Sequence, residues 1–246
     1  MYIASATDIG NIRSNNQDYV AFREYGDHEA LCVLCDGMGG HKAGEVASEI
    51  TGRYIIDHFD LHTSFTGDEM ISQWMSLLIE KANHQVMEAS SQNKDYEGMG
   101  TTCVICYIKD DDVYISHVGD SRCYSCNGYE LRQITEDDTL VNELLKSGYI
   151  TVHEASHHPQ RNVLVQAVGV SDPLKISFYK EKFNQSFLIC SDGLYNSLSS
   201  GQILDTLNSH QTIYEKAKEL INLAKKYGGY DNISAMLIEK EVSENE

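Results

Sequence analysis

Four aspartates lie beside short apolar runs, each in a turn that contains glycine. They are Asp36 in Cys-Asp-Gly-Met-Gly-Gly, Asp120 in Val-Gly-Asp-Ser-Arg, Asp192 in Ser-Asp-Gly-Leu and Asp231 in Gly-Gly-Tyr-Asp-Asn. A carboxylate beside a buried strand costs free energy unless a cation or hydrogen bonds compensate. If these strand ends converge, the carboxylates repel one another unless divalent cations lie among them. A set of carboxylate oxygen ligands favours Mg²⁺ or Mn²⁺ over zinc.

Three further residues could complete such a site. Gly37 has no Cβ, so its backbone carbonyl can approach an ion that is bound by Asp36. Arg13 and Asp18 lie in one polar turn, where a planar guanidinium suits a phosphate and a carboxylate could hold a metal-bound water. An exposed arginine beside an Asx-turn explains the same pair without any function, and the two residues alone leave both interpretations open.

The cysteines offer a competing chemistry. Six of the seven form Cys-x-x-Cys pairs, which are Cys32/Cys35, Cys103/Cys106 and Cys123/Cys126. Residues three apart on a strand point to opposite faces, so a pair within a strand cannot chelate one metal ion. We therefore expect buried apolar cysteines and not a zinc or redox protein. The odd number also favours a reducing compartment.

The elements that must position these residues follow from the apolar patterns. Strands are predicted at 30–35, 101–108, 113–118, 122–126, 129–134, 187–190 and 233–239, and helices at 43–55, 66–82, 140–145 and 212–228. Thr66 and Thr212 each begin a capping-box pattern, whereas 149–161 has no clean period and is predicted to be an irregular excursion.

Strand pairs joined by tight turns, with helices in separate blocks, predict an α+β fold with antiparallel sheets. No repeat or low-complexity linker divides the chain. We expect one domain over residues 1–240, followed by an acidic C-terminal tail at 241–246.

Charge and hydropathy exclude several classes of partner. The chain has 246 residues, and its 37 acidic and 19 basic side chains give a net charge of −18. Such a surface repels nucleic acid and anionic lipid. No apolar run is long enough to cross a membrane, and the start of the chain has no secretory signal pattern. We expect a cytoplasmic protein that binds neither nucleic acid nor membrane.

The ordered set of motifs resembles the PP2C (PPM) family of metal-dependent protein serine/threonine phosphatases, in its compact bacterial form. The matching stretches are Arg13 to Asp18, Asp36 to Glu45, Gly100 to Thr102, His117 to Arg122, Thr135 to Asp137, His158 to Asn162, Ser191 to Leu194 and Gly228 to Asn232. Each motif is weak alone, but together they span nearly all of residues 1–240. The resemblance implies an αββα sandwich, in which two antiparallel sheets flanked by helices carry a dinuclear metal site at one end.

The resemblance also implies roles for individual residues. Asp36 resembles the carboxylate that bridges two Mn²⁺ or Mg²⁺ ions, and the Gly37 carbonyl completes the shell of one of them. Asp192 and Asp231 resemble the ligands of the other ion. Asp18 resembles the acidic residue that contacts the metal through water.

Further roles concern the substrate side of the site. Arg13 resembles the phosphate clamp, and Asp120 with Asp192 matches the ligands of the third, weaker metal of bacterial members. Residues 148–162 correspond to the flap that shapes substrate access. His41 is a candidate for the acid that protonates the leaving group.

Three positions depart from the family pattern. Gln17 stands where many relatives have glutamate, which removes one outer negative charge. Met38 stands where many eukaryotic relatives have a histidine proposed as general acid. After Thr135-Glu136, the pair Asp137-Asp138 stands where relatives often have a histidine, and the local hydrogen bonding there is left open.

These implications define an expected activity. The chain should hydrolyse phosphoserine and phosphothreonine on proteins by direct attack of a water that bridges two divalent cations. Its partners should be phosphorylated proteins and, by analogy with the family, a cognate Ser/Thr protein kinase, and we expect a monomer. A catalytically silent binding module of the same fold is the rival interpretation, and the intact Asp36, Asp192 and Asp231 argue against it.

Overall fold

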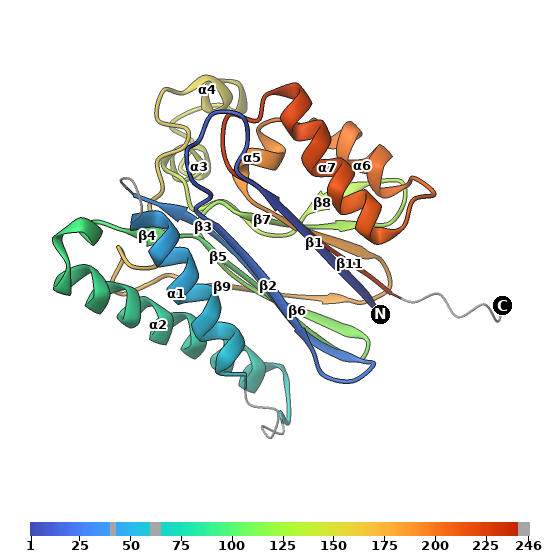
Figure 1. Cartoon of the computed structure of the whole chain (residues 1–246), viewed down its shortest axis with the longest axis horizontal. Helices are drawn as coiled ribbons and strands as arrows, with labels where there is room; N and C mark the ends of the chain where they lie inside the picture. Colours follow the sequence, from blue (N-terminus) through green and yellow to red (C-terminus); the bar gives the residue numbers. More distant parts are fainter. Residues whose placement is uncertain (40–42, 60–64, 241–246) are drawn as a thin grey trace.

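Two antiparallel β-sheets face each other, and helices cover the outer face of each one (Figure 1). This computed structural model describes residues 1–39, 43–59 and 65–240. The two facing sheets and the helices that cover them confirm the expected four-layer αββα sandwich. The predicted tail at 241–246 lies outside the described residues.

The first sheet has five strands in the order β1-β11-β10-β7-β8. Their bounds are β1 Tyr2–Asp8, β7 Arg122–Cys126, β8 Leu131–Gln133, β10 Ser186–Cys190 and β11 Ile233–Glu239. β11 agrees with the predicted closing strand. The hairpin predicted at Asn127-Gly128 is confirmed, but its loop has four residues, because Cys126 pairs with Leu131.

The second sheet has six strands, in the order β2-β3-β5-β6-β9 with the short β4 also paired to β3. Their bounds are β2 Asp18–Glu24, β3 Glu29–Met38, β4 Gly100–Thr101, β5 Cys103–Lys109, β6 Asp112–Val118 and β9 Ser177–Lys182. β3 continues beyond the predicted 30–35, so that Asp36 and Gly37 belong to the strand itself. β9 has only half-buried or exposed side chains, and its sequence did not reveal it.

Three apolar layers hold the sandwich together, and strand alternation assigns residues to them. Leu31, Val33 and Cys35 of β3 pack in the layer beneath α1 and α2, whereas Cys32 and Leu34 pack between the two sheets. A third layer lies between the five-stranded sheet and α5–α7. Alternating burial on both faces is what two covered sheets require.

The helices that cover the six-stranded sheet are α1 Ala43–Asp57 and α2 Asp68–Gln92, followed by the short 3-10 helix η1 Lys94–Tyr96. The predicted capping box at Thr66 is wrong. α2 begins one residue later than that box requires, with Gly67 at its N-cap, and the Thr66 hydroxyl donates to the sulfur of Met70 instead.

The helices on the other face are α5 Asp192–Tyr195, α6 Ser200–Leu207 and α7 Ile213–Tyr227. The capping box at Thr212 is confirmed, because its side chain accepts from the Glu215 amide while Glu215 accepts from Thr212. Among the helices of the described part of the chain, none is both long and apolar enough to cross a membrane.

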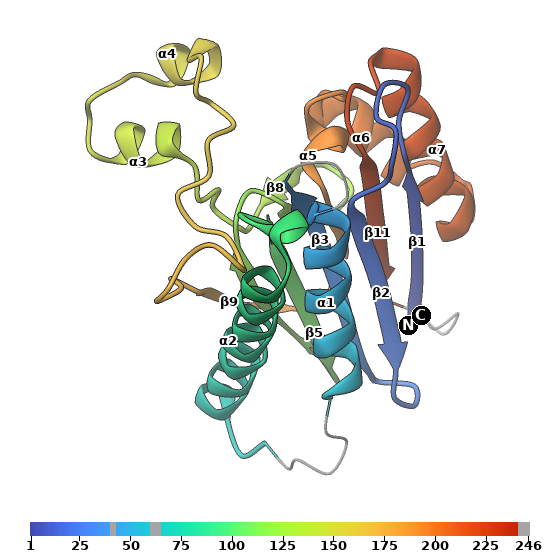
Figure 2. The ribbon, with the colours of Figure 1, turned by 60° about the vertical axis from the view of Figure 1, so that its left-hand side comes forward.

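Two short helices form a separate lobe at one end of the sandwich (Figure 2). α3 Leu140–Lys146 was predicted and ends before Gly148, which has a φ of 73°. α4 Val152–His157 lies in the segment that was predicted to be irregular, so that prediction is wrong. We call this lobe, residues 139–165, the flap; it contains residues 148–162, to which the family resemblance assigns that name.

The strand ends that carry the candidate aspartates meet at this same end of the sandwich. The end of β3 lies opposite the start of β2, with Asp36 paired to Asp18. The end of β10 lies beside the starts of β7 and β11, with Cys190 paired to both Arg122 and Ala235. The antiparallel order of each sheet thus brings residues distant in sequence to one edge.

The buried cysteines give a first prediction. All seven thiols are free and buried, and burial raises the pKa of Cys32, Cys35 and Cys190, which suppresses the reactive thiolate. We expect 5,5′-dithiobis(2-nitrobenzoate) to label no thiol of the native protein within minutes, and all seven after unfolding in guanidinium. Rapid labelling of two or more thiols in the native protein would contradict this packing.

Candidate metal centre

Asp18 and Asp36 face each other across neighbouring strands at the floor of the site. The backbone of Asp36 is fixed by the β4–β5 segment: its amide donates to Thr102 Oγ1 over 2.9 Å. Its carbonyl accepts from the Thr102 amide and from the Thr101 hydroxyl, each over 2.9 Å. The strand end is therefore rigid although its side chain faces other carboxylates.

The Asp18 carboxylate connects the two sheets. Its Oδ2 accepts from the hydroxyls of Ser191 and Ser234, at 2.8 Å and 2.6 Å, and both serines belong to the five-stranded sheet side of the site. Its Oδ1 is buried and has no hydrogen-bond partner within the described residues. A buried carboxylate oxygen without a donor is a position where a cation or an ordered water fits.

Gly37 and Gly44 allow helix α1 to pack directly on the end of β3. A Cβ at Gly37 would lie 2.2 Å from the Gly44 carbonyl oxygen, and one at Gly44 would lie 2.8 Å from the Gly37 carbonyl oxygen. No side chain fits in either position without moving backbone. Glycine is thus required here for close approach of backbone to backbone.

Asp192 and Asp231 lie beside the ends of strands of the five-stranded sheet. Asp192 is the first residue of α5, and its Oδ2 accepts from the Asn196 side chain over 3.1 Å. Asp231 precedes β11, and its Oδ2 accepts from Arg13 over 2.7 Å while its Oδ1 accepts from the Asn232 amide. Arg13, whose side chain is about half exposed, stands at the solvent side of this pair.

Asn232 holds the loop that carries Arg13. Its side-chain amide donates to the carbonyls of Ile9 and Asn15, and its Oδ1 accepts from the amide of Gln17. Asn11 adds a bond from its backbone amide to the Gly229 carbonyl over 2.7 Å. The β1–β2 loop is therefore fastened to the turn before β11, which brings Arg13 to Asp231.

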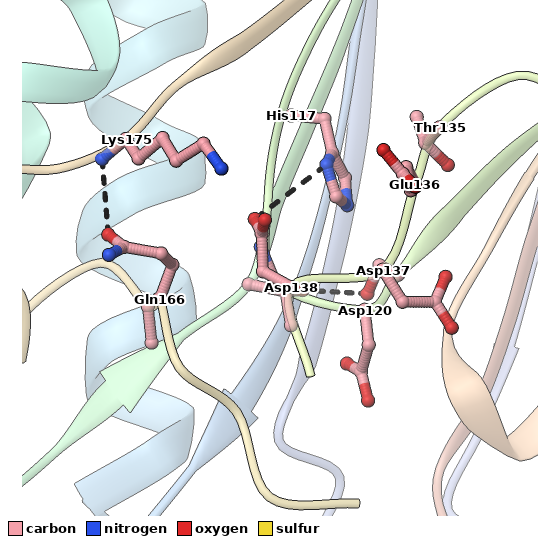
Figure 3. A network of polar contacts seen from close by, with 12 residues as sticks. His117, Asp120, Thr135, Glu136, Asp137, Asp138, Gln166 and Lys175 are labelled. Carbon is pink, nitrogen blue, oxygen red and sulfur yellow. Dashed lines mark hydrogen bonds and ion pairs between the residues drawn. The ribbon is translucent and has the colours of Figure 1, made fainter. Parts of the chain in front are cut away.

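Asp120 lies in the turn between β6 and β7 and is only 8% exposed. Asp138 secures this turn: its Oδ2 accepts from the Gly119 amide over 2.9 Å and lies 3.9 Å from Nδ1 of the buried His117 (Figure 3). The Asp138 carboxylate points toward His117, whereas that of Asp120 points away from it. The hydrogen bonding that the sequence left open at Asp138 is thus a support for the Asp120 turn.

The carboxylates raise one another's pKa. Burial, with the charges of Asp18, Asp192, Asp120 and Asp231 added, raises the pKa of Asp36 well above its ordinary range. Burial also raises the pKa of Asp18 to about 6 and that of Asp120 to about 7. The pKa of Asp192 rises to about 8, through burial and then through the charges of Asp120 and Asp231. These five side chains therefore share one electrostatic site.

The donor set fits hydrated divalent cations better than zinc. Within residues 1–39, 43–59 and 65–240, no three His, Cys, Asp or Glu side chains are grouped so that they could hold a metal ion by themselves. An ion here would take a few carboxylate oxygens and complete its shell with carbonyl and water oxygens, as Mg²⁺ does. The same finding argues against a Cys-x-x-Cys zinc site in the described part of the chain.

Of the seven principal candidate residues, the structure brings the side chains of six together, and Gly37 adjoins them through its backbone. The six are Arg13, Asp18, Asp36, Asp120, Asp192 and Asp231. His41 lies outside the described residues. Met38 packs beside Gly100, where a Cβ would lie 2.8 Å from the Met38 methyl carbon.

Sequence reasoning missed the supporting residues. Ser191, Thr102 and Asn232 stand inside the motifs that carried the resemblance, but serine, threonine and asparagine at strand ends are common turn residues. Ser234 lies inside β11 and gave no signal at all. Only the fold shows that its hydroxyl reaches Asp18.

Comparison with known proteins identifies relatives over the full length. A family model described as protein phosphatase 2C matches residues 12–237. The serine/threonine phosphatase stp of Listeria monocytogenes is 37% identical over 246 residues, covering 99% of this chain and 98% of the relative. Protein phosphatase PhpP of Streptococcus pneumoniae is 35% identical over 245 residues and 97% of each chain.

Solved structures agree with these relatives. The serine/threonine phosphatase of S. agalactiae superposes with a TM-score of 0.91 at 39% identity, covering 98% of this chain and 99% of that one. The catalytic domain of the phosphatase PstP, solved in complex with two manganese ions, has a TM-score of 0.80 at 33% identity over 96% of each chain.

The raised pKa values predict how stability depends on pH when divalent cations are chelated. Asp18, Asp120 and Asp192 have folded-state pKa values of about 6, 7 and 8, above the ordinary aspartate value of 3.8, so the folded state holds these protons more tightly than the unfolded state does. Their contribution to stability is therefore full at low pH and is lost as pH rises from about 4 to 8.

Asp192→Asn tests this directly because it removes one of the repelling charges. In EDTA at pH 8 we expect the variant to gain on the order of 2 kcal/mol, or about 4–8 °C in Tm, and to show a weaker loss of Tm between pH 6 and 8. Asp205→Asn, at an exposed position of α6, is the matched control and should leave both quantities unchanged. A lower Tm for Asp192→Asn under these conditions would contradict the assigned repulsion.

Proposed function

This chain belongs to the protein phosphatase 2C family, and we propose that its clustered aspartates bind the divalent cations on which its activity depends. It is a metal-dependent protein serine/threonine phosphatase, whose substrates are phosphorylated proteins. The observation that supports the metal site is the convergence of Asp18, Asp36, Asp192 and Asp231, whose mutual repulsion bound cations would relieve near neutral pH.

Each carboxylate has a distinct proposed role. Asp36, whose pKa is raised by the charges of the four other aspartates, would be the carboxylate shared by two Mn²⁺ or Mg²⁺ ions, and the Gly37 carbonyl would add a ligand to one of them. Asp192 and Asp231, from beside the ends of β10 and β11, would hold the other. Asp18 would hold a water of the metal shell through Oδ1, which has no partner among the described residues, while its Oδ2 accepts from two serine hydroxyls.

Asp120 and Asp192 form the proposed outer, third site. Asp120 is among the charges that raise the pKa of Asp192, so each carboxylate lies within the electrostatic field of the other. Asp120 is also nearest the flap, since it lines a cavity with Val152, Ala155 and Arg161.

The reaction divides between the cations and the chain. Two bound divalent cations lower the pKa of water and so supply hydroxide near neutral pH. Arg13 binds the phosphoryl oxygens through its planar guanidinium, which already lies within the field of Asp231, Asp192 and Asp36. Its position at the solvent side lets it orient the phosphoryl group from outside and offset charge on the equatorial oxygens. His41 remains the candidate acid for the leaving oxygen.

Several wider properties belong to the same proposal. We take residues 1–240 as one phosphatase domain, monomeric and cytoplasmic, without nucleic-acid or membrane partners. The net charge of −18 supports the exclusion of nucleic acid and anionic lipid. A Ser/Thr protein kinase as the opposing enzyme is proposed from the family alone.

Asp36→Asn tests the bridging role. Loss of the central negative charge should weaken metal binding and lower Mn²⁺-dependent hydrolysis of a phosphothreonine peptide by about 100-fold or more, since the cations supply the nucleophile. Circular dichroism should show an unchanged fold. Asp205→Asn serves again as the matched charge removal away from the site, and near-normal turnover of Asp36→Asn at saturating Mn²⁺ would refute the assignment.

Arg13→Ala tests the phosphate clamp. A charge-assisted hydrogen bond to the phosphoryl group is lost, so KM for the phosphopeptide should rise about tenfold while Mn²⁺ affinity is not weakened. Arg53→Ala, which removes an exposed arginine paired with Glu49 on α1, should leave KM unchanged. An unaltered KM in Arg13→Ala would leave the clamp without support.

A further inference from the structure

Tyr195 connects the two carboxylates of the proposed outer metal site. It is the last residue of the single-turn helix α5, which begins at Asp192. Its hydroxyl donates to the backbone carbonyl of Asp120 over 3.0 Å. One side chain thus joins the turn that carries Asp120 to the helix that carries Asp192.

Arg122 fixes the ring of Tyr195. The guanidinium carbon lies 3.5 Å from the ring centroid, which is a stacked cation–π contact. The guanidinium in turn bonds both oxygens of Asp137, with Nε to Oδ1 at 2.9 Å and Nη2 to Oδ2 at 2.6 Å. Its Nη1 donates to the Tyr124 hydroxyl over 3.0 Å. Both charged partners are largely buried, so this pair holds its geometry better than an exposed ion pair.

The same chain of contacts reaches the base of the flap. The Asp137 carbonyl accepts from the side chain of Asn142 in α3 over 2.8 Å. The next residue, Asp138, bonds Gly119 twice, through its own amide and through its carboxylate. The Asp120 turn is therefore held on one side by Tyr195 and on the other by Asp138, and both supports lead to the start of α3.

We propose that Tyr195 is a positioning residue that sets the placement of Asp120 relative to Asp192, and thereby the affinity of the outer cation site. The proposal rests on the proposed function, because it takes these two aspartates as metal ligands. Tyr195 need not touch substrate or cation to act. Its ring is held by Arg122 and its hydroxyl holds the Asp120 backbone, so a shift of either partner changes the separation of the carboxylates.

A purely structural role for Tyr195 makes a different prediction. If the ring only fills space beside Arg122, then phenylalanine, which keeps the ring and its stacking, should behave as wild type. If the hydroxyl positions Asp120, then phenylalanine leaves the Asp120 carbonyl unpaired in a largely buried turn and relaxes it. Tyr195→Phe therefore separates the two roles with the loss of one oxygen atom.

The matched control is Tyr114→Phe. The Tyr114 hydroxyl donates to Asp68 Oδ1 over 2.9 Å, so this variant also loses one tyrosine hydrogen bond of similar length. The bond joins β6 to α2 and involves none of the proposed ligands.

The experiment measures Mn²⁺ binding by titration calorimetry, and separately the Mn²⁺ concentration that gives half-maximal hydrolysis of a phosphothreonine peptide. For Tyr195→Phe we expect the Mn²⁺ affinity of the weakest site to fall by about threefold to tenfold, which is the range of one lost hydrogen bond. The half-maximal Mn²⁺ concentration should rise by the same factor. Tm in EDTA should fall by only about 2–4 °C, the cost of one lost hydrogen bond, and KM for peptide at saturating Mn²⁺ should stay as in wild type. Tyr114→Phe should leave both Mn²⁺ quantities unaltered.

Wild-type Mn²⁺ binding in Tyr195→Phe would overturn the positioning role. An equal loss in Tyr114→Phe would overturn it as well, because the effect would not be specific to the site. Asp192→Asn, measured in parallel, distinguishes failure of the proposed metal centre from failure of the proposed role of Tyr195. If it loses Mn²⁺ binding while Tyr195→Phe does not, the metal centre stands and only the role of Tyr195 falls.

Discussion

Mutual repulsion among carboxylates at one edge of the sandwich is the constraint to which the rest of the structure responds. Asp18, Asp36, Asp120 and Asp192 all have pKa values raised by burial and by their neighbours. A fold that only needed stability would not gather them, since each ionised group adds to the free-energy cost of the others. Their placement is understandable when divalent cations supply the missing positive charge, in a protein whose net charge is −18.

The fold opposes this repulsion by fixing the backbone and not by neutralising the side chains. Apart from Asp231, which accepts from Arg13, the aspartates are held by neutral donors and acceptors, such as the Thr102 hydroxyl at Asp36 and the serine hydroxyls at Asp18. Arg13 is the one cation that bonds a proposed ligand directly among the described residues, and it approaches from the solvent side. Neutral supports leave carboxylate oxygens available to cations, whereas a buried lysine or arginine at the centre would compete with them.

The sequence predicted the layers, most strands and the principal carboxylates, because each has a strong local signal. Apolar alternation with two buried faces marks β3 and β5, and reciprocal caps mark α7. The same signals fail where an element is too short to show a period, or where one residue pattern is compatible with more than one local structure. α4 has six residues and none of them is buried, so it has no apolar period. At Thr66, which fits a capping-box pattern, the hydroxyl donates to the sulfur of Met70 instead of capping the helix. Ser234 and Tyr195 could not be assigned, because their partners lie more than 70 residues away in sequence.

Electron paramagnetic resonance of the Mn²⁺-loaded protein tests the central assignment most directly, because exchange coupling requires two ions joined by a shared ligand. Asp36 is the carboxylate whose pKa is raised by all four other aspartates, so we predict a coupled two-ion spectrum for the wild type that is lost in Asp36→Asn. A wild-type spectrum of isolated Mn²⁺ alone, or a coupled spectrum that survives in Asp36→Asn, would contradict the proposal that these aspartates hold a pair of ions.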